Sequence, residues 1–207
     1  MSALAEVKPY NQVFDGQKHY RTLLQCTARP GTIGQLDDAK VEVPSQLNRA
    51  TALLALALFS GDITFWINEG AAAAANFIQR ETNAMTAPAD KADFLVFTDI
   101  DRIEELLQAK QGTLSFPDLG ASAVLQVQAI SPAPLAESLR LRLTGPGIET
   151  ETVVFVLGAS EAFFETLRER NAEFPIGVDT FLTCDSLSAG PCVMALPRTT
   201  RVHWERV

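Results

Sequence analysis

The densest group of polar side chains that could bind a ligand lies near the C-terminus, at residues 196–201. There, Arg198 and Arg201 flank the hydroxyl side chains of Thr199 and Thr200. Arginine can donate paired hydrogen bonds to a phosphate or carboxylate group, and hydroxyl groups can add further ones. The cluster could therefore hold a phosphate-bearing ligand, dock a carboxylate of a partner protein, or form a solvated edge strand. Residue chemistry does not rank the ligand above the partner.

A glycine-rich turn is the second candidate. Gly145 and Gly147 follow a segment in which Arg142 and Thr144 alternate with leucine. Such glycines let the backbone turn sharply and point N–H groups at an anion. However, the segment has no phosphate-loop lysine and no helix after it, and the proline between the glycines removes one N–H group. A connecting turn is therefore the favoured interpretation, with an anion-binding loop as the alternative.

Three further charged residues stand beside predicted turns or helix ends. Arg21 and Arg29 flank the first predicted helix, and Asp179 closes the segment Phe-Pro-Ile-Gly-Val-Asp. A helix C-terminus attracts cations, which favours a structural role for Arg29. Asp179 could orient a nearby arginine or accept a hydrogen bond from a turn, and both roles are structural before they are catalytic. Arg21 is kept as a candidate contact for a ligand or partner.

The sequence offers no complete set of groups for metal, hydrolytic or pyridoxal phosphate chemistry. Cys184, Cys192 and His203 lack the spacing of known zinc sites, and no Gly-x-Ser-x-Gly motif supports a hydrolytic triad. The lysines lie in polar or helix-end contexts that would not desolvate a Schiff-base amine. We therefore expect no catalytic residue, no metal and no cofactor. The sparse cysteines are expected to be free thiols in a reducing compartment.

Composition indicates an ordinary globular protein. The chain has 207 residues, of which 47% are apolar and 20% charged. We expect one domain over residues 1–207, in which residues 1–14 form an extended arm that could contact a partner. The longest apolar run, residues 52–59, is too short to span a bilayer, and no secretory signal is present, so we expect a cytoplasmic location. A net charge of −8 argues against nucleic-acid binding.

Apolar periodicity predicts alternating elements in the first half of the chain. Asp15 is the expected N-cap of the first helix, and Asn48 that of the second. A strand at 63–67, a helix at 71–80, a strand at 94–98 and a helix from Asp99 or Asp101 to Lys110 follow.

The second half is richer in strands. Strands are predicted at 123–129, 139–144, 152–157, 178–184, 192–196 and 201–204, with one helix at 160–173 capped by Ser160. The expected architecture is α/β, with a mixed sheet flanked by helices.

Several segments together resemble the PhnH family of the bacterial carbon-phosphorus lyase system. They are Tyr-Arg-Thr-Leu-Leu leading to Arg29-Pro30-Gly31, the stretches 142–148 and 174–184, and Leu-Pro-Arg-Thr-Thr from residue 196. Each stretch is weak by itself, but their order and spacing cover most of the chain. The resemblance carries more weight than any single motif.

The resemblance implies a fold similar to the large domain of pyridoxal-phosphate-dependent transferases, without the cofactor or its lysine, and a tendency to form homodimers. It also implies work with sister subunits, which convert ATP and methylphosphonate into alpha-D-ribose 1-methylphosphonate 5-triphosphate. No catalytic residue is carried over from the family.

The sequence therefore supports three hypotheses for the function of this chain. The leading hypothesis is a structural or substrate-positioning subunit that has no activity alone. The second is a nucleotide- or phosphonate-binding enzyme subunit in which Arg142, Arg198 and Arg201 hold a phosphate group. The third is an independent pyridoxal phosphate enzyme, which the lysine contexts disfavour.

Overall fold

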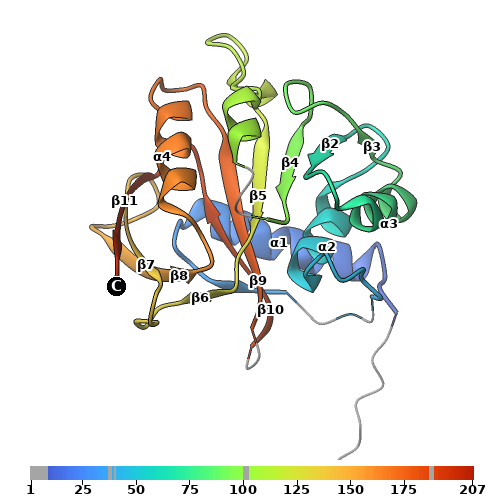
Figure 1. The fold of residues 1–207 in the computed structure, drawn as a ribbon, viewed down its shortest axis with the longest axis horizontal. Helices are drawn as coiled ribbons and strands as arrows, with labels where there is room; N and C mark the ends of the chain where they lie inside the picture. The colour runs from blue at the N-terminus through green and yellow to red at the C-terminus, as the bar shows by residue number, and fades with distance from the viewer. Residues whose placement is uncertain (1–8, 37–38, 40, 100–102, 187–188) are drawn as a thin grey trace, which may run out of the picture.

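A computed structural model describes residues 9–36, 39, 41–99, 103–186 and 189–207. Over these residues the chain forms an α/β structure with two sheets, which confirms the predicted class (Figure 1). The helices are α1 (Phe14–Ala28), α2 (Arg49–Leu58), α3 (Ala72–Thr82) and α4 (Glu161–Arg170), with short 3-10 helices η1 (Glu104–Gln108) and η2 (Pro117–Leu119). None of the described helices is long and apolar enough to cross a membrane.

The larger sheet is mixed and has seven strands, in the order β1-β10-β9-β5-β4-β2-β3. Its strands are β1 (Gly34–Gln35), β2 (Thr64–Ile67), β3 (Met85–Thr86), β4 (Phe94–Phe97), β5 (Ser122–Gln126), β9 (Asp179–Ser186) and β10 (Gly190–Leu196). The pairs from β9 through β5, β4 and β2 to β3 are parallel, whereas β10 runs antiparallel to both of its neighbours. The mixed sheet that the sequence predicts is therefore confirmed.

The smaller sheet is antiparallel, in the order β11-β7-β8-β6. Its strands are β6 (Ala129–Ser131), β7 (Leu139–Thr144), β8 (Thr152–Leu157) and β11 (Arg201–Arg206). Along β7 the leucines are buried and the arginines are more exposed, as the period-two alternation of 139–143 predicts. One face of this sheet therefore meets the core and the other meets solvent.

Both faces of the larger sheet are covered, because neighbouring residues of a strand point to opposite sides. Val96 and Val124 join a core cluster with α1, α2 and α3, whereas Leu95 and Leu125 join a cluster with α4, η1 and the smaller sheet. Figure 1 shows this layering, with α1, α2 and α3 together and α4 beside the smaller sheet. Residues 94–97 of β4 and 123–125 of β5 are accordingly all apolar, which is typical of parallel strands buried on both faces.

The predicted N-caps of α2 and α4 are confirmed, and the predicted N-cap of α1 is wrong. The Asn48 side chain accepts a hydrogen bond from Thr51 N–H at 2.7 Å, and Ser160 Oγ accepts one from Phe163 N–H at 3.2 Å. Asp15, however, lies inside α1, because Asn11 Oδ1 already accepts bonds from the N–H groups of residues 13 and 14. Phe14 thus belongs to α1 rather than to the predicted arm, and residues 1–8 of that predicted arm lie outside the described residues.

Two other predicted elements take a different form. The helix expected to end at Lys110 is the 3-10 helix η1. Its N-cap is Ile103 rather than the expected Asp99, and the alternative cap Asp101 lies outside the described residues. The strand expected at 123–129 is two strands in different sheets. Val127 N–H still bonds to a carbonyl of β9, whereas Gln128 N–H bonds to the carbonyl of Leu157 at the end of β8. The chain thus changes sheets at these two residues, which local periodicity cannot reveal.

Candidate functional site

The glycine-rich and arginine-rich segments meet at one place, which we call the junction: residues 28–31, 144–148, 174–179 and 196–201. Gly147 has φ +83°, and a Cβ atom there would overlap the carbonyl oxygen of Ala28. Gly145 has φ +132°, and a Cβ atom there would lie 2.8 Å from the carbonyl oxygen of Thr199. Both positions thus combine a backbone conformation suited to glycine with a close chain crossing. The turn has a packing role, as the favoured interpretation predicts.

The strongest polar contact in the junction joins Arg198 to Asp179. Arg198 Nη2 lies 2.7 Å from Asp179 Oδ2, its Nε lies 3.2 Å from both carboxylate oxygens, and its backbone N–H donates to Oδ1 at 2.8 Å. The guanidinium also donates from Nη1 to the carbonyl of Pro117 at 2.6 Å. Only 14% of the Arg198 side chain is exposed. Asp179 orients an arginine, which is one of the roles that the sequence suggested.

Asn171, just beyond the end of α4, ties this helix to the same region. Its side chain accepts from Val178 N–H at 2.7 Å and donates to the Val178 carbonyl at 3.1 Å. A Cβ atom at Gly177 would lie 2.5 Å from Asn171 Oδ1, so glycine leaves room for this clamp. Sequence reasoning missed Asn171, because the segment read as the last turn of a helix.

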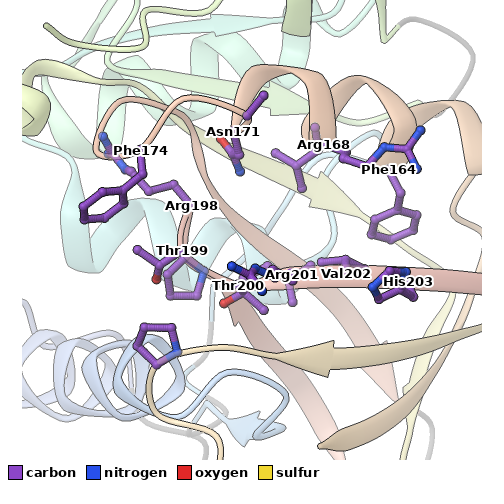
Figure 2. Close-up of a pocket in the computed structure, with 15 residues that line it drawn as sticks. Phe164, Arg168, Asn171, Phe174, Arg198, Thr199, Thr200, Arg201, Val202 and His203 are labelled. Carbon is purple, nitrogen blue, oxygen red and sulfur yellow. The ribbon is translucent and has the colours of Figure 1, made fainter. Parts of the chain in front are cut away.

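A cavity of about 550 Å³ opens at the junction, between α4 and the start of β11. Figure 2 shows α4 on one side, the strand carrying Arg201, Val202 and His203 on the other, and Phe174 and Arg198 near one end. The lining residues are Pro146, Phe164, Leu167, Arg168, Asn171, Ala172, Phe174, Leu196, Pro197, Arg198, Thr199, Thr200, Arg201, Val202 and His203. The lining thus combines apolar surface with three arginines, and among the described residues it includes no aspartate or glutamate.

The cavity contains four of the predicted site residues, and they differ in what they can still bind. Arg198 is held by Asp179, whereas Arg201 is exposed and forms no ion pair with any residue that the structure describes. The hydroxyl oxygen of Thr200 is buried without a hydrogen-bond partner in the described part of the chain. Thr199 lies between them and is partly exposed. Of the two predicted cations in the cavity, Arg201 is therefore the more available to an anionic group.

The remaining predicted site residues do not line the cavity. Arg142 lies on β7, where Glu151 accepts its Nε and Nη2 hydrogen bonds at 3.0 and 2.6 Å. This contact lowers the pKa of Glu151 below its ordinary value and raises the pKa of Arg142. Thr144 is the register partner of Arg201, and Arg21 is exposed on α1. The structure therefore does not gather Arg142, Arg198 and Arg201 around one phosphate position.

The cavity also contains two side chains that sequence reasoning did not single out. Arg168 of α4 places its guanidinium 5.0 Å from the ring centre of Trp204, and Phe174 is 77% exposed. Arg168 comes four residues after the apolar Phe164, so both lie on the same face of α4. This helical spacing was the sequence signal that could have identified Arg168. For Phe174, the corresponding sequence signal was an aromatic residue in a predicted turn, where a side chain is usually exposed.

None of the three cysteines lines this cavity. Cys26, Cys184 and Cys192 are buried free thiols. Burial raises the pKa of all three, that of Cys184 to about 12. Cys184 and Cys192 are register partners on β9 and β10. Among the described residues, no three histidine, cysteine, aspartate or glutamate side chains lie close enough together to hold a metal ion.

These features define an α/β protein in which a smaller antiparallel sheet and α4 enclose an arginine-bearing cavity beside a mixed sheet. The family described as "Bacterial phosphonate metabolism protein (PhnH)" matches residues 9–203. The chain therefore belongs to the PhnH family, and the resemblance noted from the sequence is confirmed.

Two curated relatives are similar over different lengths. The chain is 32% identical over 197 residues to "Alpha-D-ribose 1-methylphosphonate 5-triphosphate synthase subunit PhnH" of Rhizobium meliloti (strain 1021), covering 93% of this chain and 92% of the relative. It is 36% identical over 124 residues to "Putative C-P lyase subunit protein HtxG" of Stutzerimonas stutzeri, covering 60% of this chain and 57% of that relative.

Proposed function

We propose that this chain is a structural or substrate-positioning subunit of an alpha-D-ribose 1-methylphosphonate 5-triphosphate synthase, within the carbon-phosphorus lyase core complex. The observation that carries the proposal is the similarity along nearly the whole chain to the Rhizobium meliloti protein, whose name describes a subunit of that synthase. Membership of the PhnH family supports the same assignment. The name of a subunit implies partners, and we infer that sister subunits are the main partners of this chain.

The geometry of the junction supports a scaffold role over independent chemistry. Arg198 is engaged by Asp179, and Arg142 is engaged by Glu151. A group that is already paired must give up that contact before it can bind substrate or transfer a proton, and removing a partner from a poorly exposed charge is unfavourable. Arg198 and Asp179 therefore help to fix the shape of the junction, which is what a subunit that positions other components requires.

Reconstitution tests the proposal. Purified sister subunits should convert ATP and methylphosphonate to the ribose triphosphate product only when this chain is added, and the chain alone should consume neither substrate. The product can be followed by phosphorus NMR. Turnover by the purified chain alone would refute a non-catalytic role, and full turnover without the chain would refute its place in the synthase.

A second candidate function is direct binding of a nucleotide or phosphonate in the cavity. The observation that favours it is Arg201, which lines the cavity, is exposed and forms no ion pair among the described residues; Arg168 also lines the cavity but pairs with Glu165. Calorimetric titration with ATP and with methylphosphonate at low salt should then show binding that Arg201→Gln weakens. Arg206→Gln is the matched control, because Arg206 lies on the same strand, pairs with Glu161 and does not line the cavity. Absence of heat with both ligands would exclude this function for the isolated chain.

We extend this proposal to the domain organisation, oligomeric state, location and fold of the chain. We infer one domain over residues 1–207, a homodimer when the chain is isolated, and a cytoplasmic location, where ATP is available. We also infer a fold similar to the large domain of pyridoxal-phosphate-dependent transferases, without the cofactor. Light scattering tests the dimer, and an absorption band of an internal aldimine in the purified protein would contradict the expected lack of pyridoxal phosphate.

A further inference from the structure

The outer edge of β11 is open. β11 is the last strand of the smaller sheet, and β7 is its only strand partner among the described residues. Figure 1 shows β11 at the side of the molecule, next to α4. An edge strand presents unpaired backbone N–H and C=O groups, which can pair with an extended segment of another chain. The edge of β11 is therefore a backbone surface on which a further strand could be added.

The register identifies which backbone groups face outward. Val207 N–H donates to the Ser138 carbonyl at 3.0 Å, which places the backbone groups of residue 207 on the β7 side. In an antiparallel pair, successive residues direct these groups to opposite sides, so residues 201, 203 and 205 also face β7. The N–H and C=O groups of Val202 and Trp204 consequently point away from β7, toward the open edge.

The cavity gives this edge a place for side chains. Val202 is partly exposed and lines it together with Phe174, which is 77% exposed, so apolar surface is available near the outward backbone groups, whereas Phe164 and Leu167 of α4 form its buried wall. Figure 2 shows the labelled Phe164 and Val202 on facing elements, with the Phe164 ring directed from α4 toward the strand. A strand on the edge of β11 would run along this cavity, and an alternate side chain could enter it.

Charge indicates the kind of segment that fits. The cavity lining includes Arg168 and Arg201 and no carboxylate, in a chain whose formal net charge is −8. Arg201 is exposed and lacks an ion-pair partner in the described part of the chain, whereas Arg168, with 63% of its side chain exposed, forms an exposed pair with Glu165 at 3.4 Å, so Arg201 is the main cation that a partner would meet. Cations on an otherwise acidic protein attract acidic partners and fix their register.

We propose that an extended, acidic segment of a sister subunit pairs with the outer edge of β11 and places an apolar side chain in the cavity. Its backbone bonds to Val202 and Trp204, and its carboxylates meet Arg201 and Arg168. This inference rests on the proposed function, because it requires that the chain is a subunit of an assembly. It adds the surface, the binding mode and the chemistry of the partner.

Hydrogen exchange tests the backbone contact. With the full chain and purified sister subunits, the amides of Val202 and Trp204 should exchange at least about tenfold more slowly after assembly. The amides of residues 203 and 205 are bonded to β7 and should be protected before assembly as well. Unchanged exchange at Val202 and Trp204 in a formed assembly would overturn the inference and leave the proposed function intact.

Two pairs of variants test the same contact by affinity. Val202→Pro removes an outward N–H group that β7 does not use, whereas Val202→Ala shortens the side chain and keeps the N–H group. The proline variant should bind the sister subunits at least about tenfold more weakly than the alanine variant. Arg201→Glu should likewise weaken binding about tenfold or more, whereas Arg80→Glu, an exposed change on α3, should not.

Thermal unfolding shows whether Val202→Pro still folds. If it does not, the affinities of Arg201→Glu and its control Arg80→Glu test the inference. Wild-type affinity for both Val202→Pro and Arg201→Glu would overturn the inference. Slow exchange at Val202 and Trp204 in a homodimer of the isolated chain, unchanged on assembly, would assign the edge to a second copy and overturn it too. A wild-type chain that binds no sister subunit would overturn the proposed function together with this inference.

Discussion

Arg198, in the turn that follows β10, forms an ion pair with Asp179, at the start of the neighbouring strand β9. The guanidinium contacts both carboxylate oxygens at 2.7 to 3.2 Å. The same carboxylate accepts the backbone N–H of Arg198, and the same guanidinium reaches the carbonyl of Pro117. One ion pair thus joins the start of β9, the end of β10 and the segment that contains η2. This connection defines the shape of the cavity, since Arg198 is also part of its lining.

Asp179→Asn should destabilise the chain, because it leaves a poorly exposed guanidinium without its counter-charge. We expect a loss of about 1–3 kcal/mol in the free energy of unfolding, measured by urea denaturation at neutral pH. Glu165→Gln is the matched control, because its pair with Arg168 is exposed on both sides and should contribute less than about 1 kcal/mol. Equal losses in the two variants would show that burial of Arg198 does not matter.

Gly147→Ala should be more harmful than an ordinary glycine substitution. A Cβ atom at Gly147 would meet backbone atoms of Ala28 as well as adopt φ +83°, so we expect a loss of about 2–4 kcal/mol or failure to fold. Gly70→Ala is the control, because φ is +92° there and no atom lies within 4 Å of the added Cβ. It should lose about 1 kcal/mol, from backbone strain alone. Equal unfolding midpoints for the two variants would contradict the crowding at Gly147.

The ion pair of Asp93 should make stability depend on pH in the acid range. Burial raises the pKa of Asp93, but hydrogen bonds from Lys110 and Thr64 outweigh it, so the pKa is lowered overall from 3.8. A lowered folded-state pKa gives stability that is present above the unfolded-state pKa and is lost as pH falls through the folded-state pKa. Asp93→Asn should therefore lose less free energy of unfolding than the wild type between neutral pH and pH values below 3.8.

Lys110→Met gives an independent check on the same pair. It removes the ammonium group that lies 2.6 Å from Asp93 Oδ1, so the pKa of Asp93 should rise and the acid loss of stability should become smaller. The measurement is the urea unfolding free energy at neutral and acid pH. A Lys110→Met protein with the full wild-type pH dependence would assign that dependence to other carboxylates.

The cysteines should react slowly in the folded protein. The side chains are buried, and burial raises the thiol pKa, that of Cys184 to about 12, so few reactive thiolates are present at neutral pH. Ellman's reagent should detect these thiols fully only after unfolding. Ser115→Cys supplies an exposed thiol as the control for reagent access. Native labelling as fast as that of the control would contradict the burial.

Short-range patterns in the sequence predicted much of the secondary structure. Asn48 and Ser160 were identifiable as caps because a cap bonds to backbone groups only a few residues away. The alternation along β7 was equally local, since successive side chains of a strand point to opposite faces. The segments that resemble the PhnH family were also identifiable before their positions in space were known, and they meet at the junction.

Only the tertiary structure decided how these elements use their charges and edges. Arg142 and Arg198 are chemically alike in the sequence, yet one pairs with Glu151 on a solvent-facing sheet and the other with Asp179 beside the cavity. The change of sheet after β5, and the open edge of β11, likewise depend on which strands become neighbours. Spacing along the chain sets local conformation, but the partners of a side chain or strand edge are set by packing between residues far apart in sequence.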